Sequence, residues 1–218
     1  MNWELDHVFF ATANAGEVEQ SLAEFGLMFT ARRVHAGQGT ANACALFDNA
    51  YFEVLGAHDR EELRSDMVRP LGLDERIRWR ETGACPIGLC FRPGDSNRNP
   101  SVWPFETWGY EPPYVSAGKA IPIVTPPMHF TEPLVFISTW PRSSEGGSIH
   151  RGARRTLTGV EVRRPPSSAP LSAGVGWFVK NSLFSLRNEP DHFLELEWNR
   201  GQDRESHRFA AAPIGVRW

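Results

Sequence analysis

The sequence predicts an α+β fold, and three observations lead to this class. The opening of the chain shows the order strand, helix, strand, strand, strand. The last third repeats parts of this opening in weak form. The 218 residues include 17 prolines and 19 glycines, which favours a loop-rich body with many strands over a helical bundle. With 41% hydrophobic residues, a chain of this length can bury a sizeable core.

The opening segment carries the clearest signals. Residues 5–12 (LDHVFFAT) are apolar and rich in β-formers, which predicts a strand. Asn14 followed by Glu17 is the capping-box pattern, so we expect a helix to start there and to end at Gly26. Short apolar or alternating stretches then predict three strands, over residues 28–34, 41–48 and 51–56.

The middle of the chain is less regular. A charged, helical stretch over residues 59–80 is broken into two short helices by Pro70 and Gly72. Strands are expected from Pro86 and at LVFIST, and the Pro-, Gly- and Trp-rich residues between them suit an irregular wall. We divide the chain into a first module (1–58), a helical connector (59–84), an irregular second module (85–141), a loop or linker (142–156) and a degenerate third module (157–218), all within one compact body.

The weak repeat in the last third depends on two matches. LTGVEV matches LDHVFF of the opening, and HFLELEW matches AYFEVLG, with an apolar and helix-compatible segment between them. In this alignment Gly159 takes the place of His7, whereas Glu195 keeps the acid found at Glu53. The two copies therefore differ at one of their two polar positions.

Composition and missing motifs argue against several protein classes. The net charge of −3 gives no global basic field, so a nucleic-acid partner is not expected. No stretch approaches the ~18 apolar residues of a spanning helix, so no membrane partner is expected. The three cysteines form no CxxC pair and the first residues carry acids where a signal peptide has bases, which favours the cytoplasm. Serine-hydrolase, zinc-protease and dinucleotide motifs find no match.

LDHVFFAT, the capped helix and AYFEVLG together resemble the opening module of the vicinal oxygen chelate superfamily, which contains glyoxalases, bleomycin-resistance proteins and extradiol dioxygenases. The run HAGQGTANACALFDNAYFEVLG is similar to a bacterial set within the glyoxalase-like branch. The resemblance implies repeated βαβββ modules that form a curved, trough-like mixed sheet with a divalent metal on its floor.

The resemblance also implies which residues form that floor. His7 matches the metal ligand of the first strand and Glu53 matches the ligand of the fourth strand. Because side chains alternate along a strand, both can point to one face of a curved sheet. Imidazole and carboxylate suit Zn, Ni, Fe or Mn. From the residues alone, His7 could equally be a core histidine and Glu53 an exposed strand acid.

The partner module offers fewer ligands. Gly88 and Gly159 stand where a second first-strand ligand is expected, and LVFIST offers Ser138 in place of an acid. Because protein metal centres of this kind use at least three ligands, a further one is needed. The candidates for the third ligand are His129, His150 and Glu195.

A polar run next to two glycines is a candidate for substrate binding. His35, Gln38, Thr40 and Asn42 carry neutral donors and acceptors, and Thr40 and Asn42 can face the same side of one strand. Such groups suit a polar small molecule. The alternative is a tight hairpin whose polar side chains only satisfy backbone groups.

An aromatic, proline-rich segment is the second candidate for substrate binding. We expect Trp79, Trp108 and Tyr110 to form a pocket wall, although such residues can also close an irregular core. Arg33 is a candidate to face the trough and to pair with the carboxylate of Glu53. Three further arginines could bind a carboxylate of the ligand in the pocket: Arg78, Arg80 and Arg92.

The sequence therefore predicts a glyoxalase-like enzyme of the lyase, isomerase or dioxygenase type, with Glu53 and His7 as catalytic residues and a divalent metal as cofactor. The alternative is a metal-free binding or resistance protein that uses the same trough for aromatic stacking. A scaffold with an emptied site is a third hypothesis. The expected partner is a small-molecule ligand. The modules can pair within one chain or across two chains, and in the second case a second copy completes a homodimer.

Overall fold

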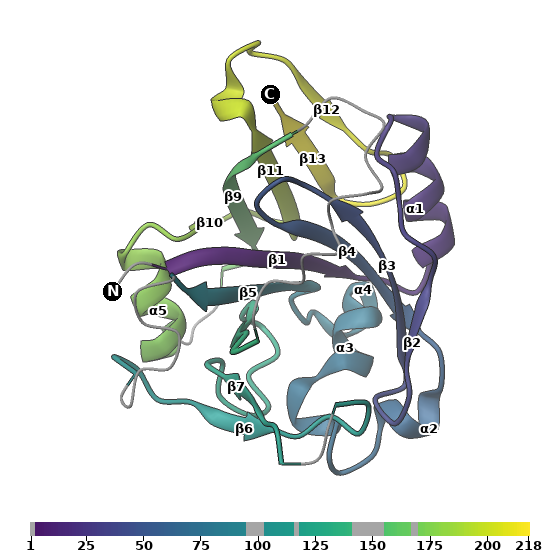
Figure 1. Cartoon of the computed structure of the whole chain (residues 1–218), viewed down its shortest axis with the longest axis vertical. Helices are drawn as coiled ribbons and strands as arrows, with labels where there is room; N and C mark the ends of the chain where they lie inside the picture. The colour runs from purple at the N-terminus through teal and green to yellow at the C-terminus, as the bar shows by residue number, and fades with distance from the viewer. Residues whose placement is uncertain (1–2, 95–102, 116–117, 141–154, 167–169) are drawn as a thin grey trace.

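The computed structural model describes residues 3–94, 103–115, 118–140, 155–166 and 170–218. Two β-sheets form the body of the molecule, and short helices cover their faces and edges (Figure 1). The first sheet has eight strands and the second has five. The α+β class expected from the sequence is confirmed.

The eight-stranded sheet is curled into a half-barrel. Its strands are β1 (Trp3–Ala11), β2 (Arg33–His35), β3 (Thr40–Leu46), β4 (Tyr51–Ala57), β5 (Ile87–Pro93), β6 (Trp108–Tyr110), β7 (Ile121–Ile123) and β8 (Leu134–Ile137). Their order across the sheet is β2-β3-β4-β1-β5-β8-β7-β6. The expected strand over residues 28–34 is shorter than predicted, because only Arg33–His35 and one bridge at Phe29 pair with β3.

The strand pairings divide this sheet into two related halves. In the first half β4 runs parallel to β1, and in the second half β8 runs parallel to β5. The central strands β1 and β5 pair antiparallel and join the halves. One chain therefore supplies both halves of the trough that the resemblance implied.

Helix α1 (Ala15–Glu24) packs its buried Val18 and Leu22 on the first half. It begins at the expected place, but the Asn14 side chain makes no capping hydrogen bond, so the capping-box prediction is wrong in its detail. Gly26 has a φ of 104°, which ends the helix as glycine's conformational freedom predicts.

The connector forms four short helical pieces instead of the two expected helices. They are α2 (Arg60–Leu63), η1 (Arg69–Leu71), α3 (Leu73–Ile77) and α4 (Trp79–Thr82). Gly72 has a φ of 66° and separates η1 from α3. The fully buried guanidinium of Arg76 donates to the carbonyl oxygens of Leu71, Cys85 and Glu132, and so holds the connector against β5 and β8.

The second sheet holds the last third of the chain in the order β10-β9-β11-β13-β12. Its elements are β9 (Leu157–Arg164), α5 (Ala173–Lys180), β10 (Ser185–Asn188), β11 (Phe193–Trp198), η4 (Asn199–Gly201), β12 (Ser206–Arg208) and β13 (Ile214–Arg217). Strands β9 and β11 run antiparallel, whereas β1 and β4 run parallel. The strands that match β1 and β4 in the last third are therefore paired in the opposite sense.

One hydrophobic core joins the two sheets. It includes Phe10 and Val54 of the first sheet together with Val162 and Leu194 of the second. A second cluster, with Phe9, packs between the first sheet and the connector. Among the described residues, no helix is both long enough and apolar enough to cross a membrane.

Candidate functional site

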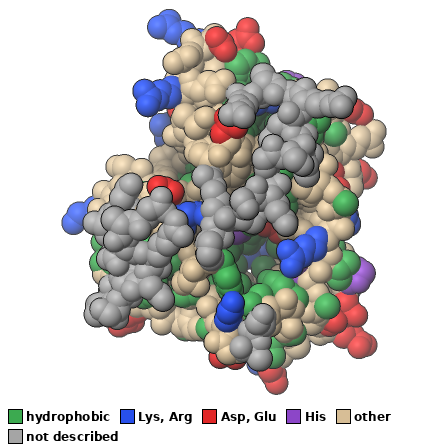
Figure 2. Space-filling model, in the orientation of Figure 1, with side chains coloured by type: hydrophobic (Ala, Val, Ile, Leu, Met, Phe, Trp, Pro, Cys, Tyr) green, Lys and Arg blue, Asp and Glu red, His purple; other side chains and the backbone are tan. Residues whose placement is uncertain are grey.

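A cavity of about 910 Å³ lies in the first sheet. The residues that line it come from strands β1 to β8, from the connector and from the loop before β7. Figure 2 shows hydrophobic side chains around a hollow on one face, with Lys or Arg side chains at its rim. The volume lies in the range of cavities that take a small molecule.

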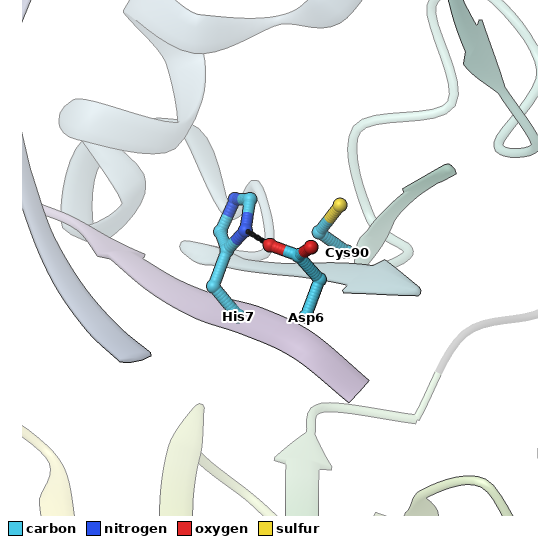
Figure 3. A group of neighbouring side chains, drawn as sticks. All are labelled: Asp6, His7 and Cys90. Atoms are coloured by element: carbon cyan, nitrogen blue, oxygen red, sulfur yellow. Dashed lines mark hydrogen bonds and ion pairs between the residues drawn. The ribbon is translucent and has the colours of Figure 1, made fainter. Parts of the chain in front are cut away.

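A β-bulge places two adjacent polar residues of β1 in this cavity. Neighbouring residues of a regular strand face opposite sides, but the register of β1 against β5 shifts between Leu5 and His7. Asp6 and His7 therefore both line the cavity. Figure 3 shows the two side chains next to each other on β1, with Cys90 on the neighbouring β5.

Asp6 fixes the orientation of the His7 ring. Nδ1 of His7 lies 2.7 Å from Oδ1 of Asp6, and the second oxygen of Asp6 forms an ion pair with Arg92. Because a carboxylate only accepts hydrogen bonds, we assign the ring hydrogen to Nδ1. The unprotonated Nε2 atom then points away from Asp6.

Nε2 of His7 faces the carboxylate of Glu53, which reaches the cavity from β4. The distance from Nε2 to Oε2 is 3.7 Å. The ring of His7 stacks on Tyr51 at 4.3 Å between centroids and forms a T-shaped contact with Phe136 at 5.3 Å. Tyr51 and Glu53 are two residues apart, so alternation along β4 brings both to one face. His7 and Glu53, which we call the floor pair, thus meet as the sequence predicted.

Burial sets the charge of the floor pair. Desolvation lowers the pKa of His7 from 6.5 to about 4, although the charge of Glu53 acts in the opposite direction. The imidazole is therefore neutral at pH 7. Glu53 is only 6% exposed and accepts a 2.6 Å hydrogen bond from Nδ2 of Asn42 on the adjacent strand β3. A buried carboxylate thus faces a lone pair and has one neutral amide as hydrogen-bond donor in the described part of the chain.

The polar run of the β2–β3 hairpin forms a network that connects the two halves. Oε1 of Gln38 accepts hydrogen bonds from the hydroxyls of Tyr110 and Tyr114, at 3.0 and 3.1 Å. Nε2 of Gln38 donates to Oγ1 of Thr40 at 2.7 Å, and Nδ1 of His35 lies 2.9 Å from the same oxygen. Gln38, Tyr110 and Tyr114 thus join the hairpin of the first half to residues of the second half beside the cavity.

The predicted wall residues divide between the cavity and other packing. Tyr110 lines the cavity, as do His35, Gln38 and Asn42, whereas Thr40 lies behind them. Trp79 is not part of the lining and packs on Phe10 and His192. Trp108 donates its indole N–H to the carbonyl of Thr125 and packs in the cluster with Phe9.

The arginines and the candidate third ligands lie in different places. Arg33 lines the cavity, while Arg92 pairs with Asp6, Arg78 with Asp74, and Arg80 stacks on Trp79. His129 pairs with Glu132 at a separate, smaller pocket, and Glu195 pairs with Arg163 on the second sheet. His150 lies outside the described residues. Neither His129 nor Glu195 reaches the floor pair.

The second half of the sheet is apolar where the first half has the floor pair. His7 pairs with Cys90 and Phe9 pairs with Gly88, so a two-fold rotation about the Val8–Leu89 pair between them places Gly88 on His7. Glu53 pairs with Phe9, and Phe136 pairs with Cys90, so the same rotation places Phe136 on Glu53. A Cβ on Gly88 would lie 2.0 Å from the ring of Phe9, which fills the space that a ligand side chain would need.

A second group of metal-ligand types lies on the Nδ1 side of the His7 ring. Donor atoms of Asp6, His7 and Cys90 all lie within 4.8 Å of one another, so by distance they could hold an ion. Both oxygens of Asp6 are already bound, and burial raises the pKa of the Cys90 thiol well above its usual value. Glu53 lies on the opposite side of the ring. The donors present are split across the imidazole and do not fit a centre of three converging protein ligands.

Several residues of the site were not predicted from the sequence. Asp6 was missed as a cavity residue because strand alternation places it on the other face, and only the bulge corrects this. Tyr51 and Phe136 were also missed. Tyr51 could have been found from its spacing of two residues from Glu53, whereas Phe136 required the pairing of β5 with β8.

The fold of this chain resembles that of a solved structure. The crystal structure of a hypothetical protein from Staphylococcus aureus matches with a TM-score of 0.59 and 11% identity, over 99% of this chain and 98% of that chain. Methylmalonyl-CoA epimerase from Mycobacterium tuberculosis matches with a TM-score of 0.35 and 17% identity, over 62% of this chain and 85% of that chain. A comparison with curated protein sequences found no match.

A family model described as a glyoxalase-like domain matches residues 5–178, which include all of the eight-stranded sheet except the first two residues of β1 and extend into the second sheet. The paired halves of the first sheet, joined through antiparallel β1 and β5, are the arrangement that the resemblance to this superfamily implied. The chain therefore belongs to the family of glyoxalase-like domains.

Proposed function

We propose that the protein is an enzyme of the isomerase or lyase type, which moves a proton on a small molecule bound above the floor pair. The family supports a small-molecule enzyme or binding protein. The proposal of catalysis depends on one observation, which is that the buried carboxylate of Glu53 faces the lone pair of His7 Nε2 at 3.7 Å.

Two hydrogen-bond acceptors that face each other at this distance repel unless a donor comes between them. A substrate that brings an acidic hydrogen to this point relieves the repulsion. Buried charged groups with such a mismatch are costly to keep, and they concentrate where they have a chemical role. The apolar lining around the pair limits water and strengthens these interactions.

Each residue of the site has a role in this proposal. Glu53 takes a proton from a carbon next to a carbonyl group, and the electron pair of the C–H bond moves toward the carbonyl oxygen. The neutral phenol of Tyr51, whose pKa burial raises, can donate a hydrogen bond to that oxygen. His7 accepts a hydrogen bond from the substrate, and Asp6 positions His7. In the isomerisation of an α-hydroxy carbonyl compound, Glu53 returns the proton to the former carbonyl carbon while the hydroxyl proton moves to the former carbonyl oxygen. In a lyase reaction the electron pair instead expels a leaving group from the next carbon. Neither route needs a redox partner.

The metal that the superfamily commonly uses has no role in this proposal. The first half offers His7 and Glu53, and the second half offers Gly88 and Phe136 at the equivalent positions. We therefore assign the proton transfer to side chains of this chain alone.

The experiment follows exchange of substrate hydrogen with solvent. Small carbonyl compounds with a hydrogen on the adjacent carbon, including 2-oxo acids, ketones and thioesters, are incubated with the protein in D2O and monitored by proton NMR. We expect one compound class to exchange, and Glu53→Gln to slow that exchange by about 100-fold or more, the range of general-base catalysis. The control is Glu4→Gln, which removes an exposed acid from the same strand as His7.

The alternative is a metal-free binding protein, which the aromatic stacking around His7 and the apolar second half favour. In that case compounds of the panel bind to the cavity without exchange, and the variant with both His7→Ala and Glu53→Ala retains their affinity. Binding without exchange by the unmodified protein would reject the enzyme proposal in favour of this alternative.

A further inference from the structure

We propose that the ligand of the cavity is an organic monoanion, a carboxylate with an apolar body, whose charged end is bound by Arg33 and Lys119. This inference deepens the proposed function by naming the substrate class of the same site. It also holds for a binding protein, because it concerns recognition and does not require the proton transfer.

Arg33 and Lys119 are the cavity cations that lack a carboxylate partner among the residues that the structure describes. Both line the cavity and both are exposed. Other arginines nearby are already paired, with Arg32 bound to Glu19 and Arg92 bound to Asp6. Two unpaired cations at one cavity create a local positive potential that attracts an anion.

The position of Arg33 directs it toward the floor pair. Arg33 on β2 lies directly across from Asn42 on β3, and residues opposite each other on neighbouring strands share a face of the sheet. The Asn42 side chain on that face holds the carboxylate of Glu53. The charge of Arg33 also reaches the opposite wall, where it opposes the rise that burial causes in the pKa of Tyr114.

The charges of the lining favour a single negative charge on the ligand. Among the residues that the structure describes, the lining acids are Asp6 and Glu53, and Arg92 already balances Asp6. The two positive charges of Arg33 and Lys119 therefore exceed the single negative charge of Glu53 by one. A monoanion brings this arrangement to neutrality, whereas a phosphate dianion adds an excess negative charge close to Glu53.

The second half of the sheet supplies the complement for an apolar body. Phe136, Ile123 and Leu134 of this half line the cavity, and Phe9 of β1 packs beside them. Burial of an apolar group here is favourable by about 25 cal/mol per Å² of surface removed from water. A ligand with a charged end at Arg33 and an apolar end at Phe136 matches both sides of the lining.

The strand order limits how far the charged end lies from the reacting atom. Strands β2 and β4 are separated only by β3, so their backbones lie roughly 10 Å apart at the usual spacing. An arginine side chain is long enough to cross much of that gap. The carboxylate of the ligand therefore lies only a few bonds from the atom next to Glu53.

The test compares acids with their neutral amides. 3-Phenylpropanoate and hexanoate, and the corresponding primary amides, are titrated with the protein, and binding is followed by ligand-observed NMR. We expect each acid to bind at least 10-fold more tightly than its amide. Arg33→Gln and Lys119→Gln should each reduce this preference, and the double variant should abolish it. Lys180→Gln, which removes an exposed charge from α5, should leave it unchanged.

The result that overturns the inference is equal affinity for acid and amide, or a preference that persists in the double variant. Absence of binding by all four probes at 10 mM would equally reject a carboxylate ligand of this kind. Glu53→Gln separates this inference from the proposed function, because it should stop hydrogen exchange while it preserves or increases the affinity for the acids. Circular dichroism and the melting temperature confirm that each variant is folded.

Discussion

At the scale of single residues, the two nitrogens of His7 have different partners and different consequences. Nδ1 is hydrogen-bonded to Asp6, which in turn forms an ion pair with Arg92. Nε2 directs its lone pair toward Glu53. The same ring is stacked on Tyr51 and shielded by Phe136. Its neutral state is therefore a property of its packing, and protonation of His7 should disturb the whole site.

This state makes folding stability depend on pH. The pKa of His7 is about 4 in the folded protein and about 6.5 when unfolded, so the unfolded chain binds more protons between these values. Stability should fall as the pH drops through this window, by about 2 kcal/mol between pH 7 and pH 5. Urea unfolding at the two pH values measures it. His7→Gln should lose this part of the dependence, while the exposed control His58→Gln should keep it.

Burial also lowers the pKa values of His35 and His192, so a smaller dependence of the same sign should remain in His7→Gln. If His7→Gln and the unmodified protein show the same change in urea midpoint, the buried neutral state assigned to His7 is wrong.

Sequence alone located some site residues and missed others for a physical reason. His7 and Glu53 were found because their strands match a known module, and Asn42 was found because polar residues alternate along one strand. Asp6 was missed because a bulge, which depends on the pairing with β5, reverses its side. Trp79 and Trp108 were grouped with Tyr110 by composition, but composition does not specify which face of the chain meets the cavity.

At the scale of elements, the β2–β3 hairpin depends on a close approach to α2. Gly39 has a φ of 78°, and its carbonyl accepts hydrogen bonds from the backbone N–H groups of His58 and Asp59. A Cβ there would lie 2.3 Å from the carbonyl oxygen of Asp59 and 2.6 Å from the backbone nitrogen of Leu63. The hairpin that carries Gln38 is thus fixed by backbone contacts that leave no space for a side chain.

Gly39→Ala should therefore destabilise the protein by about 3 kcal/mol or more, because both the backbone conformation and the contact with α2 are lost. Gly83→Ala is the matched control, since Gly83 has a φ of 71° but no atom within 4 Å of the added Cβ. That control should cost only about 1 to 2 kcal/mol. Chemical denaturation gives both values, and equal costs for the two variants would show that the close approach is unimportant.

Helices and strands with a long periodic pattern of apolar residues were predictable from the sequence. Elements whose position depends on strand pairing or on tertiary contacts were not. Strands β1 and β4 and helix α1 were expected close to their observed positions, because their apolar patterns are clear. Strands β12 and β13 were not predicted, since β12 has only three residues, all exposed, and carries no alternating pattern. The four pieces of the connector depend on tertiary anchors such as Arg76, which a local pattern does not contain.

At the scale of the whole molecule, the two sheets share one core and should unfold together. Phe10 and Val54 pack in the same cluster as Val162 and Leu194. Further links come from Asn49, whose side chain exchanges two hydrogen bonds with the backbone of Leu157. The sequence predicted a single body, but the position of the second sheet depends on these contacts between distant parts of the chain.

Leu194→Ala tests this coupling, because Leu194 is fully buried in the second sheet. Removal of a buried leucine side chain should cost about 2 to 5 kcal/mol. We expect the variant to unfold in one transition that coincides by tryptophan fluorescence and far-UV circular dichroism. Leu186→Ala, at a half-buried position of β10, should cost less. A separate early transition in Leu194→Ala would indicate that the second sheet unfolds independently.

The unequal halves of the first sheet have a consequence for stereochemistry. Polar groups stand at His7 and Glu53, while Gly88 and Phe136 occupy the equivalent positions across the pseudo-two-fold axis. A site with two identical halves accepts a molecule in either of two orientations. This site distinguishes head from tail, so a planar carbon held above it presents only one of its two faces to the carboxylate of Glu53. A product that gains a stereocentre there should be a single enantiomer.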